Sequence, residues 1–125
     1  MKFFINSGAA LLYPEGFLQR QELEALLRAE KIELQVVEEE ALGLSLATLA
    51  GAVNAPPPSM EFEGDAPAES CLVFSGLKEE KLRRIRESIA EAGLDIPYQA
   101  VITNENRSWA FGALMQEMEK EKKQQ

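Results

Sequence analysis

Histidine is absent from the 125-residue sequence, and cysteine and tryptophan occur once each. Without histidine the chain lacks the commonest general base and the commonest neutral metal ligand. Cys71 cannot form an internal disulfide, and its apolar neighbours Leu72, Val73 and Phe74 predict a buried, unreactive thiol. A lone cysteine suits a reducing compartment, so we expect a cytoplasmic protein. No cofactor or metal motif is found, and none is expected to bind.

Long apolar runs are also missing, since no segment approaches the roughly 20 residues needed to span a bilayer. The first sixteen residues hold one lysine followed by apolar side chains, as in a targeting segment. However, Asn6, Ser7 and Gly8 interrupt the apolar run, so we interpret residues 2–6 as a first strand. Membrane association is therefore not expected.

The charge is unevenly distributed over a net charge of −8. Residues 1–54 hold 4 basic and 8 acidic side chains, residues 55–70 hold 4 acidic and no basic ones, and residues 71–125 hold 9 of each. Nucleic acids require a basic face, so this balance argues against a nucleic-acid partner.

The length predicts one domain, residues 1–125, divided by a conspicuous connector. Residues 55–70 contain four prolines and only acidic charge, which predicts an extended, exposed segment. Met60 and Phe62 alternate with glutamates and are expected to fasten this connector to an edge of the sheet. The first half is then residues 1–54 and the second half residues 71–125.

Each half shows the order strand, helix, strand, helix. Expected strands are residues 2–6, 32–38, 71–75 and 98–103, and expected helices are residues 18–31, 40–53, 77–93 and 106–125. The segment Ala10–Tyr13 is an alternative first strand. Alternating strands and helices predict an α/β fold of two βαβα units that share one mostly parallel sheet, with the helices packed on it.

The second half carries a recognisable combination of features. A strand ends in Phe74-Ser75-Gly76, a helix closes on Ala92-Gly93-Leu94, Pro97 precedes the next strand, and Thr103-x-x-Asn106-x-x-Trp109 comes before an apolar helical stripe. Over about residues 70–120 this pattern resembles a bacterial family of short proteins that carry a domain of unknown function, number 3783. The resemblance implies no activity. Asn104 stands where family members often have a proline, so the turn there differs.

Thr103, Asn106, Arg107 and Trp109 lie where the last strand gives way to the last helix, and they allow two interpretations. In the first, Asn104 or Asn106 caps the helix and Trp109 packs beneath its start. In the second, the same residues form a ligand site, because α/β sheets bind ligands at the carboxyl ends of their strands and Arg107 supplies positive charge.

Ser75 lies at the end of the preceding expected strand, residues 71–75, and joins that candidate site. A serine nucleophile needs a base, and with no histidine only Lys78 lies near it in sequence, so no catalytic residue is expected.

Two kinds of function follow. The first is a non-catalytic module that binds an unknown protein partner, including a weak homodimer through a sheet edge or through residues 41–53. The alternative is a small-ligand or anion-binding protein, with enzymatic activity left open, that uses Ser75, Thr103, Asn106 and Arg107.

Overall fold

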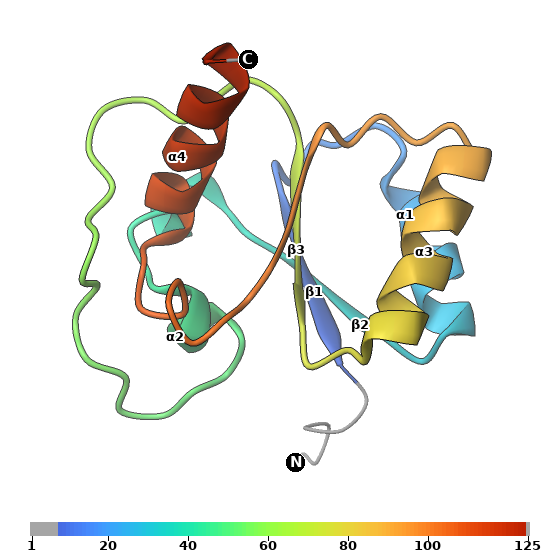
Figure 1. Cartoon of the computed structure of the whole chain (residues 1–125), viewed down its shortest axis with the longest axis horizontal. Coiled ribbons are helices and arrows are strands. Elements are labelled where there is room, and N and C mark those ends of the chain that lie inside the picture. The colour runs from blue at the N-terminus through green and yellow to red at the C-terminus, as the bar shows by residue number, and fades with distance from the viewer. Residues whose placement is uncertain (1–7, 125) are drawn as a thin grey trace.

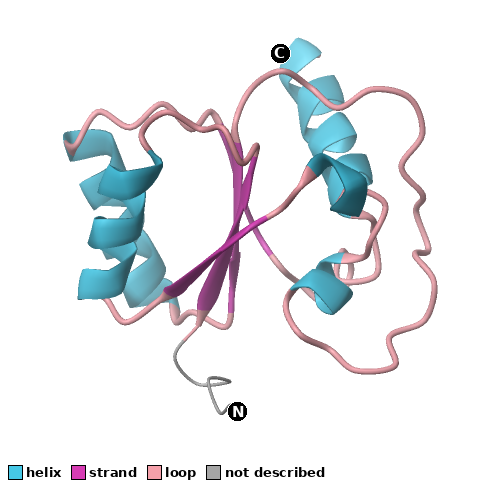
Figure 2. Ribbon diagram, turned by 180° about the vertical axis from the view of Figure 1, so that it is seen from behind, coloured by secondary structure: helices cyan, strands magenta, loops and turns pink. Residues whose placement is uncertain are grey.

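The computed structural model of the chain describes residues 8–124, in which helices cover both faces of a four-stranded sheet (Figures 1 and 2). The strands are β1 (Ala9–Tyr13), β2 (Glu33–Val36), β3 (Cys71–Ser75) and β4 (Tyr98–Val101). The helices are α1 (Arg20–Ala29), the 3-10 helix η2 (Glu39–Ala41), α2 (Leu46–Leu49), α3 (Glu79–Glu91) and α4 (Phe111–Lys123). The segment 10–13 is thus a strand, whereas the strand expected at 2–6 lies outside the described residues.

The α/β class is confirmed, but the sheet is mixed rather than mostly parallel. In the order β2-β1-β3-β4 the outer pairs are parallel, and the central pair β1 and β3 is antiparallel. Each outer pair is joined by one crossover helix, α1 or α3, as parallel strands require. The prediction of a mostly parallel sheet is wrong at the central pair. Two similar units related by a twofold axis pair their equivalent strands in antiparallel fashion.

The strands of the two β-α-β units correspond about a pseudo-twofold axis at the central pair Leu11 and Val73. The strand pairing repeats, since Ala9 faces Glu33 in the first unit and Cys71 faces Tyr98 in the second. The N–H of the residue after each outer strand also bonds to the inner strand: Val37 to Leu12 at 2.7 Å, and Ile102 to Phe74 at 2.9 Å. The fourth elements differ, because α2 has 4 residues and α4 has 13.

The helix expected at 40–53 is wrong. These residues form η2, a turn and the short α2, which Ser45 caps by accepting the Thr48 N–H at 3.1 Å. The carbonyls of Leu42 and Leu44 accept hydrogen bonds from the N–H groups that begin α4 and cannot serve a continuous helix. Gly51, at φ 105°, turns the chain out of α2.

Apolar side chains form a separate core on each face of the sheet. One core lies beneath α1 and α3, and the other lies beneath α2 and α4 (Figures 1 and 2). Alternate residues of β3 illustrate the division, since Phe74 belongs to the first core and Val73 to the second.

The connector runs around the outside of α2 and α4 without helical or strand structure, as expected (Figure 1). It is fastened to the segment before α4 rather than to an edge of the sheet. Met60 bridges Trp109, and its carbonyl accepts the Ala110 N–H at 2.9 Å. The Phe62 ring lies against Gly112, in space that a Cβ on that residue would need.

Candidate functional site

The loop from Thr103 to Trp109 is organised by the Asn106 carboxamide. Its Oδ1 accepts the Thr103 N–H at 2.8 Å, and its Nδ2 donates to the Val101 carbonyl at 3.1 Å. The Thr103 hydroxyl closes the turn by accepting the Asn106 N–H at 3.2 Å. Because residues alternate in a parallel strand, Val101 and Thr103 turn these backbone groups away from β3. Asn106 therefore satisfies part of the open edge of the sheet.

The predicted helix cap is wrong for both Asn104 and Asn106. Helix α4 begins at Phe111, and its N-cap residue, Ala110, makes no side-chain hydrogen bond. The carbonyls of Leu44 and Leu42 instead accept the N–H groups of Phe111 and Gly112, each at 2.9 Å. The carbonyls of the turn before α2 thus do the work that a capping side chain does elsewhere.

Trp109 is half-buried and packs against the core beneath α2 and α4. Tyr98 shares this core, whereas Leu77 and Ile96 belong to the core on the opposite face. The Trp109 carbonyl accepts the Leu46 N–H at 2.9 Å and so holds the start of α2. Both contacts give Trp109 a structural role.

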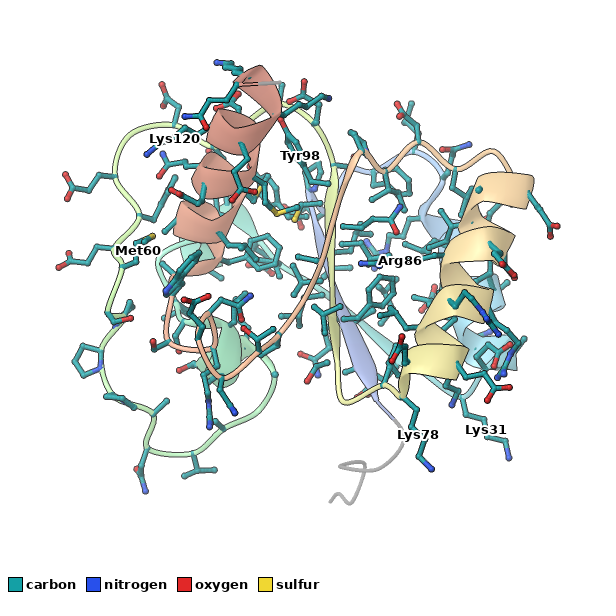
Figure 3. The ribbon with its side chains drawn as sticks, in the orientation of Figure 1. Lys31, Met60, Lys78, Arg86, Tyr98 and Lys120 are labelled. Carbon is teal, nitrogen blue, oxygen red and sulfur yellow. The ribbon has the colours of Figure 1, made fainter. Side chains whose placement is uncertain are left out.

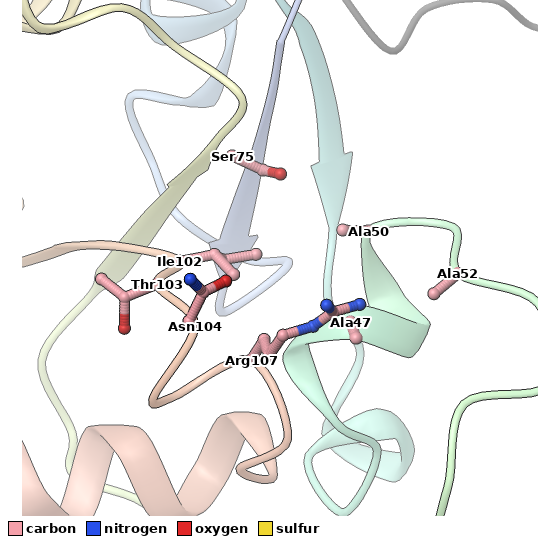
Figure 4. Close-up of a pocket in the computed structure, with 8 residues that line it drawn as sticks. All are labelled: Ala47, Ala50, Ala52, Ser75, Ile102, Thr103, Asn104 and Arg107. Atoms are coloured by element: carbon pink, nitrogen blue, oxygen red, sulfur yellow. The ribbon is translucent and has the colours of Figure 1, made fainter.

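A pocket of about 480 Å³ opens at the carboxyl ends of β3 and β4 (Figure 4). Three of the five candidate residues line it, namely Ser75, Thr103 and Arg107, whereas Asn106 and Trp109 do not. The other lining residues are Ala47, Ala50, Ala52, Ile102 and Asn104. Polar groups from the strand ends thus face a wall of alanines from α2 and the residues after it.

Arg107 dominates the chemistry of this pocket. Its side chain extends across the pocket toward Ala47 (Figure 4). None of the four ion pairs found among residues 8–124 includes Arg107, although the chain carries a net charge of −8. A guanidinium presents a planar fork of donors that matches a carboxylate or a phosphate. The Asn104 amide and the Ser75 hydroxyl supply further hydrogen-bonding groups.

The nucleophiles are poorly placed for catalysis. Lys78 directly precedes α3, and its side chain points away from the protein (Figure 3). It is not among the residues that line the pocket. Cys71 is buried in the strand, and burial raises the pKa of its thiol to about 12. The Thr103 hydroxyl is already engaged in its own turn.

Two further features of the described residues bear on the class of site. Across residues 8–124, no three cysteine or acidic side chains gather in a way that could hold a metal ion. In the same part of the chain, no helix has both the length and the apolar character that crossing a bilayer requires.

Residues 70–124 match the sequence model of one family, described as a domain of unknown function (DUF3783). This match confirms that the second half resembles this domain of unknown function, and the matched region supplies Ser75, Thr103, Asn104 and Arg107. The alanine wall comes from outside it. No curated protein sequence and no solved structure matches the chain.

Proposed function

We propose that the protein is a non-catalytic binding module whose pocket at the ends of β3 and β4 takes the anionic group of a small ligand. The observation that carries the proposal is the gathering of Arg107 with Ser75 and Asn104 around one cavity. The guanidinium has no carboxylate partner among the described ion pairs, so its hydrogen-bonding fork is available to a ligand.

A binding role is favoured over catalysis by the residues present. With no histidine in the chain, Ser75 lacks the usual activating base. The single thiol is protonated and buried, so it supplies no nucleophile at neutral pH. A reduced lone cysteine also fits the proposed cytoplasmic location.

The test is a thermal-shift titration with acetate, phenylacetate and inorganic phosphate at fixed ionic strength. A ligand that binds only the folded state raises Tm as its concentration rises. Arg107→Gln should abolish the shift, whereas Arg83→Gln, on the exposed face of α3, should leave it unchanged. If none of the three anions raises Tm, or if Arg107→Gln responds like the wild type, the proposal is wrong.

A protein partner is the second candidate, favoured by two exposed apolar side chains that flank α2. Leu44 is 46% exposed and Val53 is 84% exposed, on either side of this short helix. Apolar side chains at a surface mark interaction sites when they are grouped. Capture of a partner that is lost with Val53→Ser and kept with Arg107→Gln would support this second candidate.

Self-association remains a proposal with a narrower basis. The expected apolar helix at residues 41–53, one of the two surfaces suggested for a homodimer, does not form as a continuous helix. Asn106 hydrogen-bonds to part of the β4 edge, the other kind of surface. The edge of β2 is short and is followed by Glu38, Glu39 and Glu40, which would repel a second copy. Any dimer should therefore be weak, and sedimentation at high protein concentration tests it.

A further inference from the structure

The pseudo-twofold axis relates the pocket to an equivalent region of the same protein, and the residues of the two regions can be compared. Beyond the sheet, the two halves exchange equivalent backbone hydrogen bonds. The Leu46 N–H donates to Trp109 and the Phe111 N–H to Leu44, both at 2.9 Å. One residue further along each helix, Ala47 donates to Arg107 and Gly112 donates to Leu42, again at 2.9 Å. Each residue of the pocket therefore has a counterpart in the other half.

Two of these counterparts are much larger than the pocket residues to which they correspond. Ser75 corresponds to Tyr13, because β1 and β3 are equivalent about their central pair. Ala50 corresponds to Met115, three residues beyond the paired Ala47 and Gly112.

On the other side of the pseudo-twofold axis, at the ends of β1 and β2, the equivalent space is filled by side chains. The Tyr13 ring packs against Phe111 with 6.4 Å between centroids, and Met115 is fully buried in the same core. Leu42, the counterpart of Arg107, is also buried there. At the ends of β3 and β4 the shorter side chains of Ser75 and Ala50 leave this volume open, and Arg107 brings a charge to its rim (Figure 4).

We infer that the ligand is a small aromatic carboxylate. This inference rests on the proposed function and specifies the ligand. Its ring lies against Ala47, Ala50 and Ile102, in the place that the Tyr13 and Met115 side chains fill on the other side of the pseudo-twofold axis. Its carboxylate meets the Arg107 guanidinium, a planar pairing that two parallel N–H donors can make. A cavity of about 480 Å³ lies within the range of small-molecule sites.

Isothermal titration calorimetry with four probes separates the contributions of ring and charge. Phenylacetate should bind at least about tenfold more tightly than acetate, which lacks the ring, and than phenylacetamide, which lacks the charge. Inorganic phosphate should also bind more weakly. If acetate or phosphate binds as tightly as phenylacetate, the aromatic inference fails while anion binding stands. If no anion binds, both fail.

Replacing Ala50 with methionine, the residue at the equivalent position 115, fills the pocket and provides the matched variant. Ala50→Met should weaken phenylacetate binding at least about tenfold without lowering Tm, because the same side chain is accommodated at Met115. Ala25→Met, on the exposed face of α1, controls for the added side chain and should bind as the wild type does. Unchanged binding of phenylacetate to a folded Ala50→Met variant would overturn the inference. So would equal losses in both variants.

Discussion

Replacing Asn106 with alanine removes two hydrogen bonds that hold the loop carrying Arg107. The carboxamide bonds to Thr103 at 2.8 Å and to Val101 at 3.1 Å. Each such bond contributes about 0.5–1.5 kcal/mol net, so Asn106→Ala should lower the free energy of unfolding by about 1–3 kcal/mol. Partial exposure of the loop favours the lower half of that range, because water replaces part of what is lost.

Urea unfolding followed by the fluorescence of Trp109 measures this change, since the chain has one tryptophan. Asn104→Ala is the control, because Asn104 is exposed and none of the side-chain hydrogen bonds described here involves it. The control should change stability by less than about 0.5 kcal/mol. Equal losses in the two variants would refute the assignment of Asn106 to the edge of β4.

The remaining predictions concern the connector, the thiol and one ion pair. Gly112→Ala should destabilise the fold by about 1–3 kcal/mol through overlap with Phe62, and Phe62→Ala should relieve much of that loss in the double variant. If Phe62→Ala does not reduce the loss of stability, the overlap does not involve Phe62. Cys71 should react with a thiol reagent at pH 8 only as fast as the protein unfolds, because burial raises its pKa to about 12. Reaction at the rate of a free thiol would contradict this burial. The Arg84 guanidinium donates to the Glu30 carboxylate at 3.0 Å and lowers the pKa of that carboxyl. The pair therefore stabilises the fold at pH values above the usual carboxyl range, and this stabilisation is lost as pH falls through the lowered pKa. An NMR titration of Glu30 should move to higher pH in Arg84→Gln, and an unmoved midpoint would exclude the pair.

Local sequence patterns located most of the strands and helices. The apolar run Cys71–Ser75 is β3, and the stripe that contains Ile85 and Ile89 is the buried face of α3. Both signals come from side chains that meet their own face of the sheet, so the period alone suffices. The ends of β3 are as predicted, whereas α3 begins at Glu79 and ends at Glu91, inside the expected range 77–93, as helix ends commonly do.

The failed predictions of the helix at 40–53 and of the side-chain cap share one cause, since distant backbone partners decided both. Nothing near Leu42 and Leu44 in sequence shows that their carbonyls accept hydrogen bonds from the start of α4. The same contact satisfies the first N–H groups of α4, which made a side-chain cap unnecessary. Helical periodicity and cap residues describe only local interactions, and both were overridden by this exchange between the halves.

The candidate site was only partly accessible to sequence reasoning. Ser75, Thr103 and Arg107 could be placed together, because each follows a strand end in an α/β pattern. The wall formed by Ala47 and Ala50 could not, since small apolar residues give no chemical signal. It becomes informative only when the structure aligns these alanines with Gly112 and Met115 of the other half.

The most direct test of the account is a ¹H–¹⁵N NMR titration of the full chain with phenylacetate. We expect saturable shifts concentrated on the amides of the residues that line the pocket, namely 47, 50, 52, 75, 102–104 and 107. The same titration of Arg107→Gln should show these shifts only at much higher ligand concentration. Shifts centred on another surface, or an Arg107→Gln variant that saturates with the wild-type midpoint, would contradict the claim that this pocket binds an anion through Arg107.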